Sequence, residues 1–128
     1  MWKNKAIEVM RSANLKLTPQ RLKLIELIAD LGIKHPTLSE ILEKMREEFP
    51  TTSFSTLYTN VLMLKALKLL DVFTIGDEMR IELNLKPHLN IFEGEIRDFE
   101  DEELVKRIEE RIGRKIKFLI AFVESERR

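Results

Sequence analysis

The sequence predicts an α+β protein made of two small domains. Three observations predict it: apolar residues recur at helical spacing up to Leu70, the period changes to two over residues 72–83, and a short strand–strand–helix–strand pattern follows Pro87. A chain of 128 residues has room for one compact domain or two small ones. The hydrophobic fraction of 44% is ordinary for a globular chain with a buried core.

The first two helices are predicted over residues 2–13 and 19–31. In the first segment apolar and basic side chains alternate at helical spacing. Thr18 followed by Pro19 is a strong start for the second, because threonine caps a helix and proline fits its first position. Gly32 then supplies the C-terminal stop.

The next two helices are predicted over residues 37–49 and 53–70. Thr37 and Glu40 have the spacing of a capping box. Ser53 is the expected N-cap of the following helix, because its hydroxyl oxygen accepts from free backbone N–H groups of the first turn. A short turn joins the two helices, and the second one is polar and free of acidic residues. This pattern is typical of a helix-turn-helix.

The polar face of the segment 53–70 is the candidate DNA-binding surface. No acidic residue occurs in residues 51–70, so this helix start could approach phosphates and base edges without repulsion. Its candidate contact residues carry hydroxyl groups: Ser53, Ser55, Thr56, Tyr58 and Thr59.

The net charge of zero argues against nucleic-acid binding, but the distribution of charge argues for it. Residues 1–23 contain six Lys and Arg residues and one acidic residue, Glu8. If this segment packs beside the acid-free helix, the two form a basic face on a neutral protein.

The strands after Leu70 complete a winged helix. Residues 72–75 and 79–83 flank the turn 76–78 as a hairpin, with Arg80 available at the wing. Pro87 prevents the second strand from continuing. We therefore predict a winged-helix DNA-binding domain over residues 1–84, a hinge at 85–87 and an α/β dimerisation domain over 88–128.

The second domain is predicted to dimerise through its last strand. Residues 89–92 and 96–99 are expected strands around Gly94, and residues 104–112 an expected helix that ends at Gly113. The segment 116–123, IKFLIAFV, is apolar on both faces and must be covered on both sides. Some 40 residues cannot easily do so alone, which predicts a homodimer interface.

Several classes of protein are excluded or disfavoured. The chain has no cysteine, which rules out disulfides, thiolate metal sites and cysteine nucleophiles. It has no apolar run of about 20 residues and no signal peptide, so we expect a cytoplasmic protein. No residues combine into a nucleophile, a base and an orienting group, so we do not expect an enzyme.

Four segments resemble the ferric uptake regulator family: LTPQR (17–21), HPTLSEILEKMREEFP (35–50), SFSTLYTNVLMLKAL (53–67) and RIELNL (80–85). The resemblance is strong over residues 15–85 and weaker but collinear over 88–123. It implies a dimeric, metal-responsive repressor that binds double-stranded DNA. Tyr58 stands where the family's recognition helix reads DNA, and Lys16 and Arg21 match positions that touch phosphate. The usual arginine after the tyrosine is replaced by Thr59, which removes a side chain capable of bidentate base contacts.

The resemblance also implies a regulatory metal site between the two domains. The matching positions carry His35, Glu82, His88 and Asp98, which include both histidines of the chain. This ligand set suits one divalent ion of iron, manganese, zinc, cobalt or nickel without choosing among them. The family's structural zinc site is missing, because Asn90 and Glu93 stand where one cysteine pair would be.

Two alternatives stay open at this point. One is a regulator that binds DNA without metal. The other is a winged-helix protein-interaction module that has lost DNA binding, which the neutral net charge and Thr59 favour and the basic N-terminal segment opposes.

Overall fold

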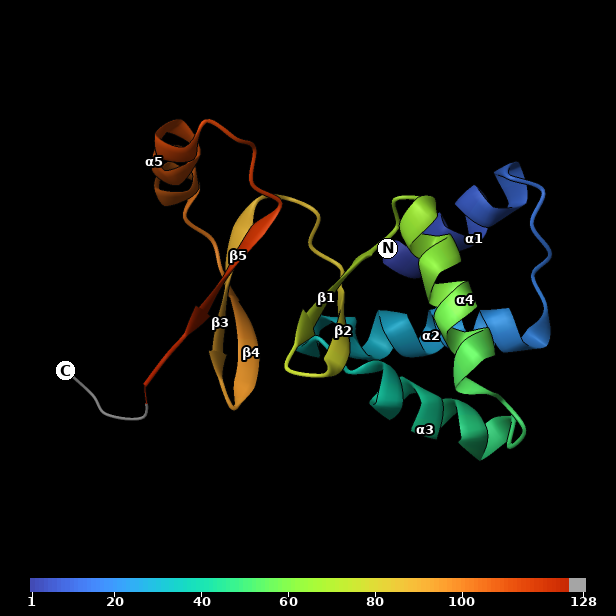
Figure 1. The fold of residues 1–128 in the computed structure, drawn as a ribbon. Helices are drawn as coiled ribbons and strands as arrows, with labels where there is room; N and C mark the ends of the chain where they lie inside the picture. The colour runs from blue at the N-terminus through green and yellow to red at the C-terminus, as the bar shows by residue number, and fades with distance from the viewer. Residues whose placement is uncertain (125–128) are drawn as a thin grey trace. The chain divides into compact units, whose positions relative to one another are not determined.

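The computed structural model describes residues 1–124 and divides the chain into two compact units (Figure 1). The first unit is Met1–Leu83 and the second begins at Asn84. This division falls one residue before the predicted end of the first domain. No helix within residues 1–124 is long and apolar enough to cross a lipid bilayer.

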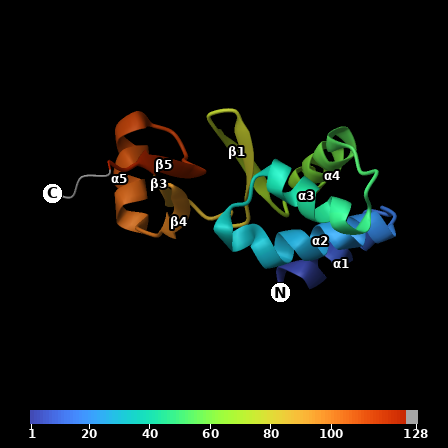
Figure 2. The ribbon, with the colours of Figure 1, turned by 90° about the horizontal axis from the view of Figure 1, so that it is seen from below.

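The first unit contains four α-helices followed by a β-hairpin. In chain order its elements are α1 (Trp2–Ser12), α2 (Pro19–Leu31), the 3₁₀ turn η1 (Gly32–Lys34), α3 (Leu38–Glu48), α4 (Phe54–Ala66), β1 (Asp71–Ile75) and β2 (Glu78–Glu82). Helices α2 and α3 pack together and α4 packs on α3, while β2 lies against α3 and η1. Figure 2 shows these elements from below.

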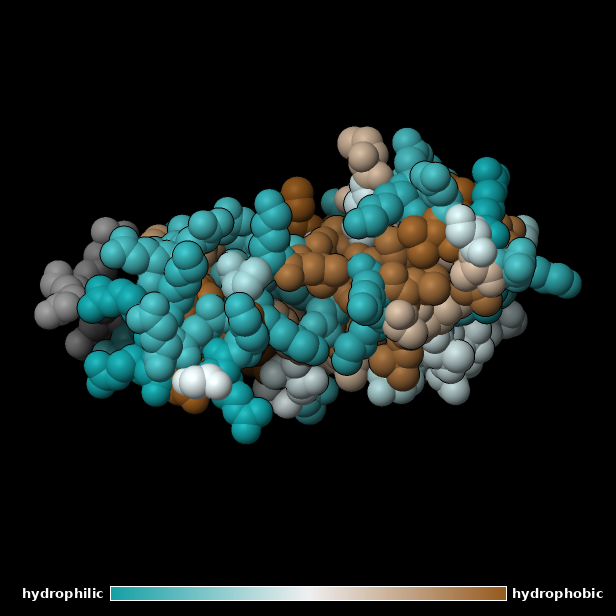
Figure 3. Space-filling model, turned by 90° about the horizontal axis from the view of Figure 1, so that it is seen from above, coloured by the Kyte–Doolittle hydropathy of each residue, from teal (hydrophilic) through white to brown (hydrophobic). Residues whose placement is uncertain are grey.

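The predicted apolar stripes form one core in this unit. Each of α1 to α4 contributes buried side chains, and β2 contributes Ile81. The buried members are Ala6, Met10, Leu24, Ile25, Ile28, Leu38, Ile41, Met45, Leu57, Val61, Leu64, Leu69, Leu70 and Ile81. In Figure 3 apolar side chains also gather on one exposed face of this unit, whereas hydrophilic side chains dominate the visible face of the second.

The predicted helix starts are confirmed at atomic detail. The hydroxyl oxygens of Thr18, Thr37 and Ser53 each accept a hydrogen bond from the backbone N–H three residues ahead. In the capping box the Thr37 hydroxyl also donates to the Glu40 carboxylate, 3.2 Å away. Each bond satisfies a donor that the first helical turn would otherwise leave free.

The helix ends differ from the expectation in two places. Gly32 follows α2 as predicted, but its φ of −56° is helical and the chain continues into η1; His35 takes the left-handed conformation instead. Helix α4 ends at Ala66 rather than Leu70, because Lys68 adopts a φ of 60°. There the Leu69 N–H donates to the Leu64 carbonyl and the Lys68 N–H to the Lys65 carbonyl, the bonds of a Schellman motif.

The predicted hairpin forms, with a turn one residue shorter than the predicted 76–78, because Glu78 already belongs to the second strand. Strands β1 and β2 pair antiparallel from Asp71 opposite Glu82 to Ile75 opposite Glu78, around a two-residue turn at Gly76 and Asp77. Gly76 has a φ of 63°, a conformation that glycine adopts without steric cost. With the helix-turn-helix of α3 and α4, this hairpin makes the unit a winged helix.

The second unit is a three-stranded sheet with one helix. Its elements are β3 (His88–Glu93), β4 (Glu95–Phe99), α5 (Glu102–Ile112) and β5 (Phe118–Phe122). The strand order is β4-β3-β5, with β4 antiparallel and β5 parallel to β3. Helix α5 packs on β3 and ends at Gly113, as predicted. The predicted last strand is shorter than the apolar segment and lies at a sheet edge, half-buried except at Phe122.

Gly32 is required for a close approach rather than for its backbone conformation. A Cβ atom on this residue would overlap the side chain of Leu83, although the backbone angles suit any amino acid. Alanine in place of a compatible glycine normally stabilises a protein by about 0.4–1 kcal/mol. We expect Gly32→Ala to destabilise by about 1–3 kcal/mol instead, because overpacking dominates.

Thermal unfolding of single and double variants measures this effect. Leu83→Ala removes the overlapping atoms, so the cost of Gly32→Ala should shrink or reverse sign in that background. An equal cost in both backgrounds would show that the overlap is not its cause.

Candidate nucleic-acid interface and metal-binding groups

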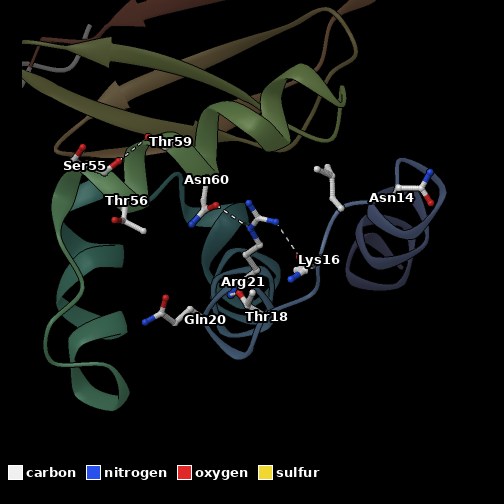
Figure 4. Close-up of a pocket in the computed structure, with 10 residues that line it drawn as sticks. Asn14, Lys16, Thr18, Gln20, Arg21, Ser55, Thr56, Thr59 and Asn60 are labelled. Carbon is white, nitrogen blue, oxygen red and sulfur yellow. Dashed lines mark hydrogen bonds between the residues drawn. The ribbon is translucent and has the colours of Figure 1, made fainter.

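The start of helix α4 and the segment before α2 border one pocket (Figure 4). The segment before α2 provides Asn14, Leu15, Lys16 and Thr18, the first turn of α2 provides Gln20 and Arg21, and α4 provides Ser55, Thr56, Thr59 and Asn60. The lining residues, all within the described part of the chain, include no aspartate or glutamate. The structure therefore brings Lys16 and Arg21 to the acid-free helix start, as the charge distribution suggested.

Arg21 ties the two sides of this pocket together. Its Nε donates to the side-chain oxygen of Asn60 at 3.1 Å, and its Nη1 donates to the carbonyl oxygen of Lys16 at 2.9 Å (Figure 4). A guanidinium has five N–H donors, so three remain after these two bonds. Arg21 can thus hold the pocket together and still offer donors to a phosphate.

The exposed hydroxyl groups of α4 differ in what they offer to a ligand. Ser53 Oγ donates to Thr56 Oγ1 at 2.9 Å while it accepts from the Thr56 N–H. Thr59 Oγ1 donates to the Ser55 carbonyl oxygen at 2.9 Å. The hydroxyl protons of Ser53 and Thr59 are therefore used within the helix, whereas Ser55 and Thr56 retain theirs for a partner.

Tyr58, on α4, lines a different hollow from the one that Arg21 of α2 lines. It is half-buried and stacks on Phe54, with ring centroids 6.1 Å apart and planes 13° apart. Both rings line a second hollow that reaches the hairpin residues Thr74, Asp77, Glu78 and Met79. Arg21 and Tyr58 thus line two different hollows beside α4. The hydroxyl groups of Ser55, Thr56 and Thr59 lie in the hollow that Arg21 lines.

Arg80 occupies the base of the wing rather than its tip. Its Nη1 donates to the His35 carbonyl oxygen at 3.0 Å, its Nη2 lies 3.7 Å from Glu78 Oε2, and its side chain is only 18% exposed. The tip itself carries Asp77 and Glu78. The guanidinium therefore fastens the hairpin to the segment before α3, and its position does not favour the free contact expected from the sequence.

His35 is a buried histidine in an uncommon backbone conformation. Its φ of 53° is left-handed, which costs free energy for a residue other than glycine. Its Nδ1 lies 3.2 Å from the Ile81 carbonyl oxygen and 3.6 Å from Glu82 Oε2. Because a carbonyl oxygen only accepts, this contact fits a ring that carries its proton on Nδ1.

Glu82 is buried beside His35 within the same unit. A carboxylate removed from water is stable only when a charge, a metal ion or hydrogen bonds compensate it. Ile81 and Glu82 are consecutive residues at the end of β2. Because the Ile81 carbonyl contacts the His35 ring, the strand also places Glu82 beside that ring.

His88 and Asp98 form a similar pair in the second unit. His88 is buried, and its Nδ1 lies 2.6 Å from the Lys86 carbonyl oxygen, which fits a proton on Nδ1. Asp98 Oδ1 lies 3.9 Å from the His88 Nε2. Both histidines of the chain therefore direct Nδ1–H at a backbone carbonyl, the arrangement that orients metal-binding histidines.

Asn84 organises this second pair, and the sequence analysis did not select it. Its side-chain oxygen accepts from the Lys86 N–H at 3.1 Å, and its amide nitrogen donates to Asp98 at 3.3 Å and to Glu100 at 3.2 Å. The signal was present, since asparagine two residues before a turn amide is typical of an Asx-turn. Asn60 and Phe54 were missed too, because the role of Asn60 depends on Arg21, far along the chain, and that of Phe54 on its exposure.

A helix-turn-helix, an antiparallel wing and a basic pocket beside an acid-free helix define a winged-helix DNA-binding protein. Its two buried histidines, each beside a carboxylate, have the chemistry of a divalent metal site. The chain belongs to the ferric uptake regulator family, whose model matches residues 12–124.

Relatives with known names support this assignment. The chain is 55% identical to the ferric uptake regulation protein homolog of Archaeoglobus fulgidus over 126 residues, which cover 98% of each chain. It is 30% identical to the peroxide-responsive repressor PerR of Staphylococcus aureus over 103 residues, 77% of this chain and 69% of that one. The solved ferric uptake regulator of Helicobacter pylori, described as having three functional metal binding sites, superposes with a TM-score of 0.72 at 20% identity, over 98% of this chain and 96% of that one.

Family membership determines the class of function. The chain is a DNA-binding transcriptional regulator and not an enzyme. Regulators of this family are dimeric and respond to metal ions. The absence of cysteine from all 128 residues means that no cysteine zinc site exists here.

The tautomers of the two histidines are directly testable. We expect the metal-free protein at neutral pH to carry the proton on Nδ1 of both His35 and His88, because each Nδ1 faces a carbonyl oxygen. Two-bond ¹H–¹⁵N correlation spectra distinguish the tautomers, and His35→Ala assigns the signals because the chain has only two histidines. An Nε2–H tautomer at either residue would contradict the assignment.

Proposed function

We propose that this chain is a homodimeric regulator that binds duplex DNA through helix α4 and the basic segment before α2, under the control of one divalent transition metal ion per chain. The observation that carries the proposal is the shared pocket of Lys16 and Arg21 with Ser55, Thr56 and Thr59. Cations beside a polar helix start are the combination that contacts phosphates and bases together. A partner of this kind implies action in the compartment that holds the chromosome, which we expect to be the cytoplasm.

Within this proposal the predicted contact residues have different tasks. Lys16 and Arg21 provide charge for phosphates, and Ser55 and Thr56 offer hydroxyl groups to base edges. Ser53 holds the helix start in shape through its two bonds to Thr56. Tyr58 and Thr59 contribute apolar surface, while Arg80 acts indirectly by holding the wing.

The metal proposal rests on the two histidine–carboxylate pairs. We propose that His35 and Glu82 of the first unit and His88 and Asp98 of the second bind the same ion. Such an ion would neutralise two carboxylates and limit the freedom of the hinge, so that paired recognition helices are held for half-sites one helical turn apart. Two imidazoles and two carboxylates suit Fe²⁺, Mn²⁺, Co²⁺, Ni²⁺ or Zn²⁺.

The homodimer proposal rests on the apolar surface of the second unit. Phe99 is 48% exposed, Ile112 56% and Phe122 67%, in a unit too small to bury them alone. Strands β4 and β5 are both edges of the sheet, where backbone groups are open to a second copy. Without cysteine ligands, burial of these side chains by a partner subunit is the stabilisation that the unit can gain.

The acidic wing tip favours one alternative. Asp77 and Glu78 would repel phosphate, as expected of a protein-interaction module that has lost DNA binding. The basic pocket on the other flank of α4 opposes this alternative. A regulator that binds DNA without metal is separated from our proposal by binding measurements before and after chelation.

The phosphate contacts are tested by the salt dependence of binding. We expect Lys16→Met to weaken binding to all duplexes similarly and to reduce the slope of log affinity against log salt by about one. Lys16 suits this test because its exposed side chain makes no hydrogen bond in the described structure. Fluorescence anisotropy with random and selected duplexes measures both quantities.

The control for this experiment is Arg107→Met, which removes an exposed cation from α5. Its slope should equal that of the wild type. If the Lys16→Met slope also equals the wild-type slope, Lys16 does not contact phosphate.

The shared metal site is tested by stoichiometry in single-ligand variants. We expect one bound ion per chain in the wild type, and a loss of metal affinity of at least about 100-fold in both His35→Ala and His88→Ala, because either change removes a ligand of the same ion. Elemental analysis and calorimetric titration with Mn²⁺ and Co²⁺ measure this. Both variants should lose the effect of metal on DNA binding.

Two outcomes would contradict the shared site. If each variant keeps about half of the metal, the two pairs bind separate ions. If His35→Ala keeps stoichiometric metal, His35 is not a ligand. Glu43→Gln, at an exposed position of α3, is the control for a general effect of charge.

A further inference from the structure

Helix α4 presents an exposed aromatic ring at the position where it would enter a DNA groove. Phe54 is its first residue and is 47% exposed. We propose that Phe54 reads the C5-methyl groups of thymines in the major groove, and that this regulator selects its sites mainly by such apolar contacts. This inference rests on the proposed binding of duplex DNA.

The first reason is that the helix start has no side chain for bidentate base contacts. Bidentate readout needs Arg, Lys, Asn, Gln or a carboxylate aimed at the base edge. On the first two turns of α4 the only such residue is Asn60, and its side-chain oxygen accepts from Arg21. Arg21 lies on α2 rather than on α4, and two of its donors are bonded to Asn60 and to the Lys16 carbonyl.

The second reason is that the remaining hydroxyl groups discriminate poorly. The Thr59 hydroxyl donates to the Ser55 carbonyl and so offers no donor to a base. Ser55 and Thr56 can each make a single hydrogen bond, which different bases accept equally well. Sequence preference at the start of α4 therefore depends on another feature of the base edges.

The third reason is the way in which Phe54 is held. Its ring stacks on Tyr58 at a centroid distance of 6.1 Å and an interplanar angle of 13°. Stacking fixes the ring while half of its surface stays open to solvent. A single orientation of an exposed apolar surface lowers the entropy lost on binding.

The surroundings of the ring favour a neutral apolar group over a phosphate. Phe54 and Tyr58 share their hollow with Leu38 and Met79, which are apolar, and with Asp77 and Glu78, which are acidic. The carboxylates would repel phosphate oxygens. The thymine methyl is an uncharged apolar group on the major-groove edge, and it separates thymine from cytosine.

The test replaces single thymines by deoxyuridine in a duplex selected by the wild-type protein from a random pool. This change removes the C5-methyl group and keeps charge and base pairing. At the thymines that Phe54 contacts, we expect wild-type affinity to fall about fourfold, the effect of burying one methyl group. Phe54→Ala should bind thymine and deoxyuridine duplexes equally, and Phe54→Leu should retain part of the difference.

Two controls separate this effect from folding. Ile33→Ala removes another exposed apolar side chain, outside α4, and should keep the full fourfold difference. Thermal unfolding of each variant shows whether the winged helix is intact, and the thymine-to-deoxyuridine ratio is measured within one variant, so a general loss of affinity cancels.

The outcomes distinguish this inference from the proposed function. Failure of the wild type to bind any duplex would overturn both. Selective duplex binding with no position sensitive to deoxyuridine would overturn only the role of Phe54. So would a thymine preference that persists unchanged in Phe54→Ala.

Discussion

The hydrogen bonds between the second wing strand and the segment before α3 connect the proposed metal ligands to the DNA-binding surface. The Ile81 N–H donates to the Pro36 carbonyl at 3.1 Å, the Ile81 carbonyl lies 3.2 Å from His35 Nδ1, and Arg80 donates to the His35 carbonyl. Three bonds therefore fix a left-handed histidine that local sequence would not favour. Thr37 caps α3 two residues later, so His35 lies directly before a helix of the helix-turn-helix.

The same contacts give Arg80 a structural role, although its guanidinium is bonded within the protein. A histidine in an unfavourable backbone conformation persists only when its surroundings over-determine it. The isolated bridge between Thr37 and Arg80 and the close packing of Leu83 on Gly32 act on either side of His35. The wing thus supports the position of the proposed ligand His35, while Lys16 and Arg21 supply positive charge beside the start of α4.

Local chemistry explains which parts of the fold could be predicted from the sequence. Thr18, Thr37 and Ser53 cap the helices that they were expected to cap, because a cap depends on three or four consecutive residues. Lys68 could not be predicted to end α4, since lysine carries no preference for the left-handed conformation and the turn depends on burial of Leu69 and Leu70. At the candidate sites, the sequence showed which residue types could bind DNA or metal. The roles of Arg80 and Asn84 depend on partners far along the chain, and that of Phe54 depends on its exposure. Neither can be derived from spacing alone.

The loss of cysteine changes what must hold the second unit together. A zinc ion bound by four thiolates contributes folding free energy on its own, and this chain has no thiolate. What the unit offers instead is apolar area: β5 is half-buried along most of its length, and Phe99 and Phe122 remain open. Covering that area with a second copy would make folding of this unit depend on protomer concentration.

Asn84 adds a local constraint within this unit. The hydrogen bonds from its side-chain amide to Asp98 and Glu100, together with its Asx-turn, hold one histidine–carboxylate pair without a structural metal. The proposed metal ligands can therefore keep their positions in a chain without a structural zinc site, since these positions depend on backbone carbonyls and one asparagine rather than on cysteines.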